Sequence, residues 1–211
     1  DENLILRVDD DFELGGEFNL NALITVLENP NIHYCSDVER QIGNGRIQSG
    51  ELRISSGIIE FRDNKTPLIK IKEDKEWKYL ENNNIKYARA DYMRNLILIK
   101  RLCFETIKWN EDLYFTGEHL DFYLQLRKNN FIGAFTPDSI HLHREDLKIQ
   151  SIDMDKEKEW RIRDVEKNKK VVFNKTWNGL PEYKGSRRLK VKNFIDKING
   201  LIFTHWGSKN R

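Results

Sequence analysis

The sequence feature that most constrains this chain is a short apolar segment that ends in three adjacent aspartates. Residues 4–8 read Leu-Ile-Leu-Arg-Val, and Asp9, Asp10 and Asp11 follow directly. A short apolar run closed by a polar cluster is typical of a buried strand. Alternate residues of a strand share a face, so Asp9 and Asp11 are expected to point the same way. Because desolvating a carboxylate is costly, the acids need a cation or solvent. They suit Mg²⁺ or Mn²⁺ carrying a phosphate, and the alternative is a solvated acidic turn.

The remaining pattern predicts one α/β domain. Apolar residues at helical spacing from Leu20 to Leu27 predict an amphipathic helix that Pro30 ends. The charged segment 72–84 is expected to be a loop. Other short apolar or alternating runs predict further strands and helices. The expected strands lie at 32–41, 45–62, 68–71, 96–99, 131–135 and 139–143, and the expected helices lie at 101–107, from Thr116 to about Lys128, and at 153–175.

The last part of the chain is chemically distinct from the rest. Residues 184–211 carry eight basic residues and one acid, so the body is acidic although the net charge is +2. Apolar residues at helical spacing predict a basic amphipathic helix there, and the stretch 187–206 can contact an anionic membrane surface. The alternative, slightly favoured, is a terminal helix packed on the domain with its lysines in solvent. We expect no nucleic-acid partner, because no recognition motif is present.

Composition also bounds the expected location. No run approaches the roughly 20 apolar residues that a membrane-spanning helix needs. Two cysteines do not make a disulfide framework, which favours a reducing compartment. We therefore expect a cytoplasmic protein, peripheral on the membrane if the basic tail binds lipid.

Two further polar groupings can carry chemistry. Glu118 and Asp121 lie three residues apart at a predicted helix start. A carboxylate there can take a proton from a hydroxyl nucleophile, or it can simply complement the helix dipole. His141 and His143 share one face of a predicted strand. They can supply a nitrogen ligand to a metal held by the acids of the first strand, or they can be surface histidines.

Asp91 and Asn95 form a third polar pair before an apolar run, and they either line a cleft or belong to a loop. Taken in order, these groupings resemble the GT-A glycosyltransferases. The resemblance is closest to the β-1,4-N-acetylgalactosaminyltransferases that make gangliosides and to related family-2-like enzymes, and it covers roughly residues 4–150. The matching segments are Val8–Phe12 as the metal motif, Asp91 with Asn95 as Asp-x-x-x-Asn, His119–Tyr123 as the acidic aromatic segment, and Asp138–His143 as a strand ending in a ligand histidine.

The resemblance implies a GT-A type α/β fold, with a Rossmann-like mixed sheet flanked by helices. It also implies a metal-dependent, inverting hexosyltransferase. The donor would be a nucleotide sugar, most simply a UDP-sugar, and the acceptor would be a hydroxyl of a glycan or glycolipid. The Mn²⁺ or Mg²⁺ ion would be bound by Asp11, Asp9 and His143, with Asp10 beside the cofactor.

The same resemblance implies the acid–base and acceptor residues. The base would be Asp121, with Glu118 and then His119 as the next candidates, because many relatives carry Glu-Asp at the helix start where this chain has Glu118 and His119. Acceptor contacts are expected from Asp91, Asn95 and Trp109.

The expected organisation has three parts. Residues 1–150 would be the metal- and acceptor-binding half of a GT-A core that lacks the preceding nucleotide-binding half. Residues 151–180 would be a helical extension, and residues 181–211 a basic tail that begins at a linker marked by Pro181 and Gly185. Two alternatives to a glycosyltransferase remain. One is a non-catalytic carbohydrate- or partner-binding fragment of such a fold, and the other is a different phosphate-transfer enzyme that uses the same acids.

Overall fold

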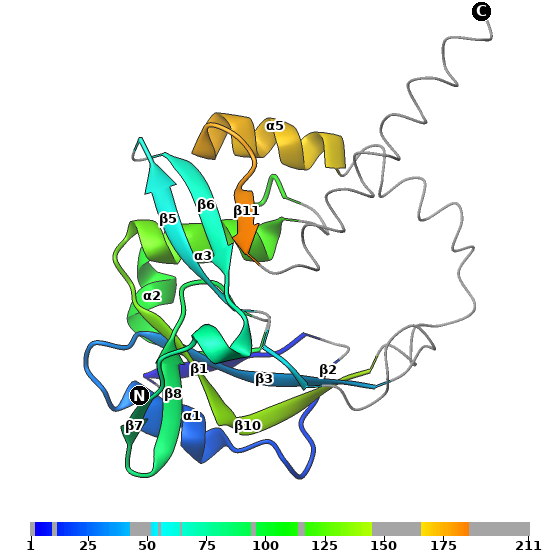
Figure 1. Cartoon of the computed structure of the whole chain (residues 1–211). Coiled ribbons are helices and arrows are strands. Elements are labelled where there is room, and N and C mark those ends of the chain that lie inside the picture. Colours follow the sequence, from blue (N-terminus) through cyan, green and yellow to red (C-terminus); the bar gives the residue numbers. More distant parts are fainter. Residues whose placement is uncertain are drawn as a thin grey trace, which may run out of the picture.

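The protein is a mixed α/β structure in which helices flank a mixed parallel and antiparallel sheet (Figure 1). The computed structural model describes residues 3–9, 12–42, 52–54, 56–63, 65–93, 96–113, 117–144 and 166–185. The expectation of a mixed sheet between helices is confirmed.

The main sheet has eight strands, and its central pair is parallel. Its path runs β1 (Leu4–Arg7), β9 (Ile97–Lys100), β3 (Tyr34–Ile42), β10 (Gly133–Arg144), β8 (Ile85–Arg89) and β7 (Leu80–Asn82). Two short strands lie off this path, because β2 (Phe12–Glu13) pairs with β10 and β4 (Leu52–Arg53) pairs with β3. Strands β3 and β10 run parallel, and the other described pairs of this sheet are antiparallel.

The two faces of the main sheet have different covers (Figure 1). Helix α1 (Leu20–Leu27) packs on one face, where Leu4 and Leu6 of β1 join its apolar residues in one cluster. Helices α2 (Arg101–Thr106) and α3 (Glu118–Lys128) cover the other face, where Ile5 packs. Because side chains alternate along a strand, the residues after β1 that follow the phase of Ile5 point toward α3.

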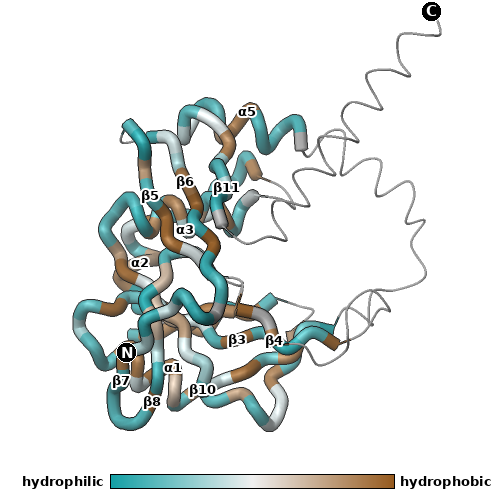
Figure 2. The backbone as a smooth tube through the Cα atoms, in the orientation of Figure 1, coloured by the Kyte–Doolittle hydropathy of each residue, from teal (hydrophilic) through white to brown (hydrophobic). Residues whose placement is uncertain are grey.

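A second sheet of three strands stands beside the main one. It is formed by β5 (Gly57–Arg62), β6 (Thr66–Ile71) and β11 (Glu182–Gly185), and α5 (Glu166–Trp177) lies next to it. A β-bridge between Gly57 and Tyr92 joins the second sheet to the body. Hydrophobic residues concentrate on the strands of both sheets, whereas the β7–β8 turn is hydrophilic (Figure 2).

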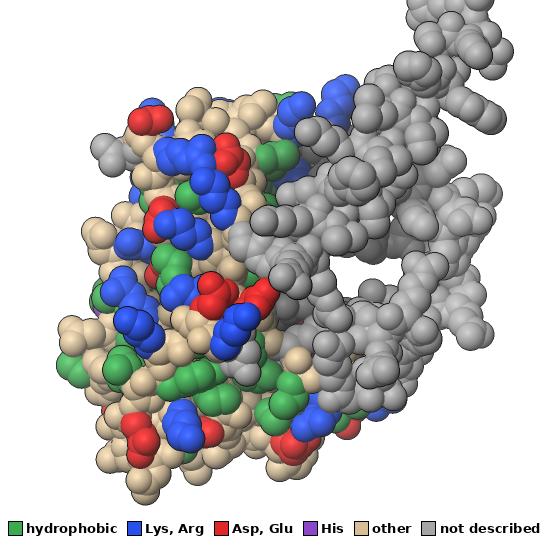
Figure 3. Space-filling view, viewed as in Figure 1, with side chains coloured by type: hydrophobic (Ala, Val, Ile, Leu, Met, Phe, Trp, Pro, Cys, Tyr) green, Lys and Arg blue, Asp and Glu red, His purple; other side chains and the backbone are tan. Residues whose placement is uncertain are grey.

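Charges on the second sheet are partly neutralised within it. Lysine and arginine side chains gather over β5 and β6 on the face seen in Figure 3. Lys70 pairs with Glu60 at 2.5 Å, and Arg62 pairs with Glu182 at 2.6 Å. The first pair joins the neighbouring strands β5 and β6, and the second joins the two edge strands β5 and β11. The basic surface therefore includes charges that already have partners.

The structure corrects three local expectations. The predicted loop 72–84 contains a 3₁₀ turn, Asp74–Glu76, and strand β7, because Asn83 and Asn84 adopt positive φ and close a β7–β8 hairpin. The expected linker at Pro181 and Gly185 contains β11, which pairs in parallel with β6. The two strands predicted at 131–135 and 139–143 form the single strand β10, with a register shift between Phe135 and Ile140.

Several expectations fall on residues outside those described. The basic tail at 187–206 and the first part of the helical extension belong to this group. Residues 45–51 of the predicted strand region 45–62 belong to it as well. The last turns of the predicted 153–175 helix are present as α5. In the described part of the chain, none of the helices is both long and apolar enough to cross a bilayer.

Candidate functional site

The end of β1 meets the start of α3 in a cluster of charged and aromatic side chains. Arg7 Nη2 lies 2.5 Å from Asp9 Oδ1 and 3.4 Å from His119 Nε2. His119 Nε2 in turn lies 3.2 Å from Glu118 Oε1. The side chains of Glu118 and His119 remain 23% and 26% exposed. Three of the predicted site residues, Asp9, Glu118 and His119, are therefore brought together around Arg7, which the sequence interpretation had not assigned.

Trp109 forms the wall of this cluster. Its ring stacks on Phe122 with centroids 4.5 Å apart and an interplanar angle of 11°. The Arg7 guanidinium carbon lies 5.0 Å from the Trp109 ring centroid, and His119 meets the ring edge-on at 5.6 Å. Cation–π contacts of this kind stabilise an arginine away from bulk water. Because Phe122 covers one face of the indole, Trp109 is placed to shape the cluster rather than to offer two open faces to a sugar.

The electrostatics of the cluster favour a neutral imidazole. Burial lowers the pKa of His119, and the charge of Arg7 lowers it further, whereas Asp9 and Glu118 oppose the shift. A neutral imidazole near pH 7 can accept a proton. Glu118 Oε2 is buried and has no hydrogen-bond partner among the described residues. An unsatisfied buried acceptor is costly, so this oxygen is a natural point of contact for a ligand hydroxyl.

Asp121, the first-ranked base from the sequence, lies in the core. Its residue is 1% exposed. Trp177 Nε1 donates to Oδ1 at 2.5 Å and Gln125 Nε2 donates to Oδ2 at 2.6 Å. Burial raises the pKa of Asp121, and these hydrogen bonds oppose the rise. A base role for Asp121 stays a prediction, but Glu118 and His119 are the more accessible candidates.

A second polar cluster lies between β3 and β10. His141 Nδ1 is 2.6 Å from Asp37 Oδ1, and both side chains are fully buried. His143 Nδ1 is 3.2 Å from Glu39 Oε1, and His143 retains slight exposure. The interpretation of His141 as a surface histidine is therefore wrong. The sequence interpretation missed Asp37 and Glu39. They lie two residues apart in a predicted strand, and this spacing places them on one face.

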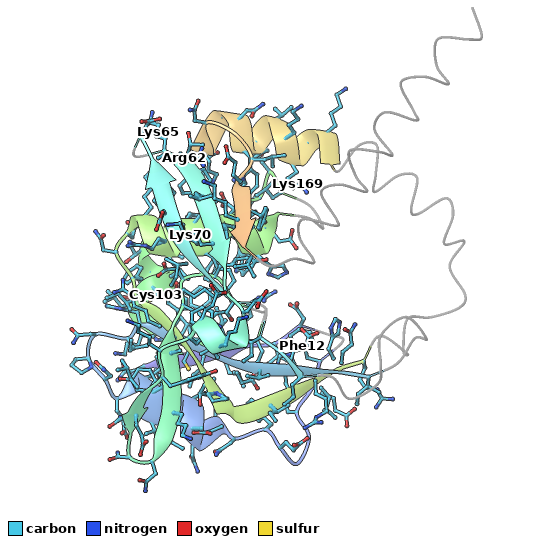
Figure 4. All side chains as sticks on the ribbon, in the orientation of Figure 1. Phe12, Arg62, Lys65, Lys70, Cys103 and Lys169 are labelled. Atoms are coloured by element: carbon cyan, nitrogen blue, oxygen red, sulfur yellow. The ribbon has the colours of Figure 1, made fainter. Side chains whose placement is uncertain are left out.

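The acid motif links these two clusters. Phe12 N–H donates to the carbonyl oxygen of Asp9 at 3.2 Å, so the two residues that flank Asp10 and Asp11 are hydrogen-bonded to each other. Asp10 and Asp11 themselves lie outside the described residues. The Phe12 ring stacks on His141 with centroids 4.3 Å apart, and Phe12 is the Cα partner of His143 in the β2–β10 ladder (Figure 4).

The two clusters belong to different faces of the sheet. Asp9 lies with Arg7 on the face covered by α3, whereas Phe12 packs with the apolar cluster on the α1 side. The side chains of Asp9 and Phe12, which flank Asp10 and Asp11 in the sequence, therefore lie on opposite faces of the sheet. Among the residues that the structure describes, no three His, Cys, Asp or Glu side chains converge as metal ligands. A metal at this motif would depend on Asp10 and Asp11.

Asp91, expected to contact an acceptor, is built into the framework. It is almost fully buried, its Oδ2 accepts from the Ile59 N–H at 3.0 Å, and Arg127 Nε lies 3.5 Å from the same oxygen. Tyr34 Oη donates to the backbone oxygen of Asp91 at 2.9 Å. Burial raises the pKa of this carboxyl. Asp91 thus ties the second sheet to the body, and its predicted partner Asn95 lies outside the described residues.

Comparison with known proteins finds no protein-family model that matches the chain and no matching curated protein sequence. The fold and the two clusters therefore define a class only in coarse terms. That class is a mixed-sheet α/β protein with a half-buried acid–histidine–arginine cluster at the end of a strand.

Proposed function

We propose that this chain is the metal- and acceptor-binding part of a GT-A glycosyltransferase. It would transfer a sugar from a nucleotide sugar, most simply a UDP-sugar, to a hydroxyl of a glycan or glycolipid, with inversion. One observation carries the proposal: Arg7 links Asp9 to His119 at the start of α3, and Phe12, three residues on from Asp9, packs on the histidine strand. The acid motif is thereby flanked by candidate bases on one side and a candidate ligand strand on the other.

Glu118 and His119 are the groups that would handle the acceptor proton. Glu118 Oε2 is buried without a partner in the described part of the chain, and His119 is held neutral by burial and Arg7. In the proposed reaction the acceptor oxygen attacks the anomeric carbon while the bond to the nucleoside diphosphate breaks. The hydroxyl proton passes to Glu118, or to His119 beside it, which is general base catalysis.

The predicted ligands are of the kind that a hard divalent ion takes. Carboxylates and one imidazole suit Mn²⁺ or Mg²⁺, and the predicted ligands are Asp9, Asp11 and His143, with Asp10 adjacent. Because Asp9 pairs with Arg7 on the α3 face, whereas His143 contacts Phe12 on the α1 side, the proposal assigns the ion to Asp11 and His143 and leaves Asp9 with Arg7. A ligand histidine commonly pairs its other ring nitrogen with a carboxylate, and the contact between His143 Nδ1 and Glu39 has this form. When bound, the ion would offset the charge of the leaving diphosphate.

The test combines metal binding with turnover. We expect the protein to bind Mn²⁺ in the presence of UDP, and to hydrolyse or transfer from a UDP-sugar. Glu118→Gln should lower kcat by about 10²–10⁴-fold, the usual contribution of a general base. Glu111→Gln, at an exposed acid of the preceding loop, is the matched control and should leave kcat unchanged. Full activity in Asp11→Ala would exclude the metal assignment.

A second candidate, a non-catalytic carbohydrate-binding module, is favoured by the Arg7–Asp9 ion pair. Its 2.5 Å contact joins two mostly buried side chains and already neutralises the Asp9 carboxylate. A module of this kind would bind sugars equally well in EDTA and would turn over no donor. A glycosyltransferase would instead lose donor binding on chelation, so one titration with and without EDTA separates the two candidates.

A further inference from the structure

We propose that the outer edge of β1 pairs with β1 of a second copy of this chain, so that the two main sheets join into one. Among the described strands, β1 is the terminal strand of its sheet, with β9 on its inner side. The two copies would run antiparallel about a two-fold axis, the commonest symmetry of homo-oligomers. This interface does not depend on the proposed glycosyl transfer.

The hydrogen-bond pattern of β1 identifies the backbone groups that face its outer edge. The Arg101 N–H, which directly follows β9, donates to the carbonyl oxygen of Asn3 at 2.8 Å. Residues of an antiparallel strand alternate between bonding to one neighbour and facing away from it, so Ile5 also bonds to β9. Leu4 and Leu6 therefore direct their N–H and C=O groups at the outer edge. In the described part of the chain these groups have no hydrogen-bond partner.

The edges of three other described strands are protected, whereas the edge of β1 is not. On β5, Asp91 Oδ2 accepts from the Ile59 N–H, and Arg127 Nε donates to the Ile59 carbonyl. Strand β7 has only three residues, and β11 carries two exposed charged residues. Short length and charge are devices that prevent edge pairing. Strand β1 reads Leu-Ile-Leu-Arg, and its one charge, on Arg7, already pairs with Asp9.

The sequence of β1 is complementary to itself in the antiparallel direction. With Ile5 on the two-fold axis, Leu4 of one copy lies opposite Leu6 of the other, and Arg7 lies opposite Asn3. Leu4 and Leu6 then exchange both of their backbone hydrogen bonds, and apolar side chains meet on both faces of the sheet. The two Arg7 side chains lie at opposite ends of the paired strands. With Leu6 on the axis they would instead be diagonal neighbours on one face, so the first register is favoured.

This edge also leaves apolar surface that pairing would cover. Leu4 and Leu6 are only partly buried at the margin of the cluster on the α1 side, and Ile5 is partly buried on the other face. Leu102 of α2, one residue beyond the bond to Asn3, is 55% exposed. An apolar edge strand without protecting charges is a site for pairing with another chain. A second copy supplies a strand that matches it in both hydrogen bonds and side chains.

The test removes an outward N–H and keeps the hydrogen bonds between β1 and β9. Leu6→Pro lacks the N–H that faces the outer edge, which is the position where a strand tolerates proline. Leu6→Ala is the matched control, because it removes the same side chain from the α1-side cluster but keeps the N–H. Sedimentation velocity of the full chain over a range of concentrations gives the dissociation constant of the dimer. Urea denaturation establishes that each variant folds.

We expect the wild-type chain to dimerise and Leu6→Pro to raise the dissociation constant about 10–100-fold above that of Leu6→Ala, the loss expected for two symmetry-related hydrogen bonds. Equal dissociation constants for the two variants would place any dimer interface elsewhere and overturn the proposal. A wild-type chain that stays monomeric at all concentrations would overturn it too, and would show that the edge is left open or accepts a different partner. Neither result bears on the proposed glycosyl transfer.

Amide hydrogen exchange of the wild-type chain decides the matter if Leu6→Pro does not fold. The Leu4 and Leu6 amides should be protected only at concentrations where the dimer forms, because their N–H groups bond only across the interface. The Ile5 amide bonds to β9 and should be protected at every concentration. Protection of the Leu4 and Leu6 amides that does not change with concentration would contradict the pairing.

Discussion

The contact between Trp177 and Asp121 gives the sharpest quantitative prediction. Trp177 Nε1 donates to Asp121 Oδ1 at 2.5 Å, and the indole also stacks on Phe61 with centroids 5.8 Å apart. Trp177→Phe keeps an aromatic ring for that stacking and removes only the N–H donor and part of the ring. Asp121 then stays buried, with Gln125 and Asn110 as side-chain hydrogen-bond partners.

The expected loss has two parts. Shrinking the buried ring costs about 1–2 kcal/mol in transfer and cavity terms. Losing a hydrogen bond to a charged group costs about 1.5–3 kcal/mol. At pH 7.5 the free energy of unfolding should therefore fall by about 3–5 kcal/mol when Trp177 becomes Phe. Trp77→Phe is the matched control, because Trp77 is also buried, at 7% exposed against 2% for Trp177, but its Nε1 has no partner among the described residues.

The ring part and the hydrogen-bond part of this stability loss depend differently on pH. Burial raises the folded-state pKa of Asp121 above its unfolded value, so the folded state binds more protons. Its contribution to stability therefore falls as pH rises through the interval between those two pKa values. Trp177→Phe removes a bond to the charged form and extends that interval upward. The stability difference from wild type should therefore be larger at pH 7.5 than at pH 4, because protonation of Asp121 at lower pH diminishes the share of the charged form that the Trp177 bond stabilises.

The assay is urea denaturation followed by far-ultraviolet circular dichroism at the two pH values. Trp77→Phe should lose only the ring contribution, with the same value at both pH values. The reasoning is refuted if the two tryptophan variants lose equal stability at pH 7.5, or if the Trp177→Phe loss does not grow with pH. A double-mutant cycle with Asp121→Asn gives the coupling directly.

Two further substitutions test the framework around the site. Gly117, the N-cap of α3, has φ +89°, and a Cβ there would lie 3.1 Å from Phe173. Gly117→Ala should therefore lower the free energy of unfolding by about 1–2 kcal/mol in urea denaturation. Gly16→Ala, where a Cβ meets nothing within 4 Å, should be near neutral, and an equal loss of stability in both variants would contradict the strain argument. Asp91→Ala leaves the Ile59 N–H buried without its acceptor and should cost about 1–3 kcal/mol, whereas Asp91→Asn keeps an acceptor and should cost less. An unchanged unfolding midpoint in Asp91→Ala would contradict the structural role of Asp91 and leave its predicted acceptor contact as the alternative.

Elements with strong local signals were predictable from the sequence. The apolar run at residues 4–8 forms β1, and the Leu20–Leu27 spacing forms α1. The helix from 118 to 128 also follows its local pattern, although its N-cap is Gly117 rather than Thr116, which lies outside the described residues. Strand β11 escaped prediction because its four residues carry no strand pattern of their own. They become a strand only by pairing with β6, more than a hundred residues away.

The site was also predictable only in part, because local patterns place residues on an element but do not give their partners from distant segments. Asp9, Glu118 and His119 lie near one another through Arg7, and their predicted roles as ligand and bases stay predictions. Arg7 was missed because a single arginine inside an apolar strand has no spacing signal. Helical spacing placed Glu118 and Asp121 on one face. It does not predict that Trp177, from a distant segment, donates a hydrogen bond to the Asp121 carboxylate.

The environments of the aspartates separate structural carboxylates from candidate reactive ones. Three aspartates are buried and paired within the fold: Asp37 contacts His141, Asp91 accepts from the Ile59 N–H, and Asp121 accepts from Trp177. Burial raises the pKa of each, so each contributes less to stability near neutral pH than at a pH below its ordinary pKa.

Each of those partners lies far away in the sequence, which is why periodicity alone cannot separate a framework acid from a reactive one. Asp9 and Glu118 differ from all three, because they keep partial exposure and meet at a common arginine and histidine. A carboxylate that reacts with a ligand must be reachable and must not be saturated by donors of its own chain. By that criterion we assign the proposed chemistry to the junction of β1 and α3 rather than to the buried aspartates.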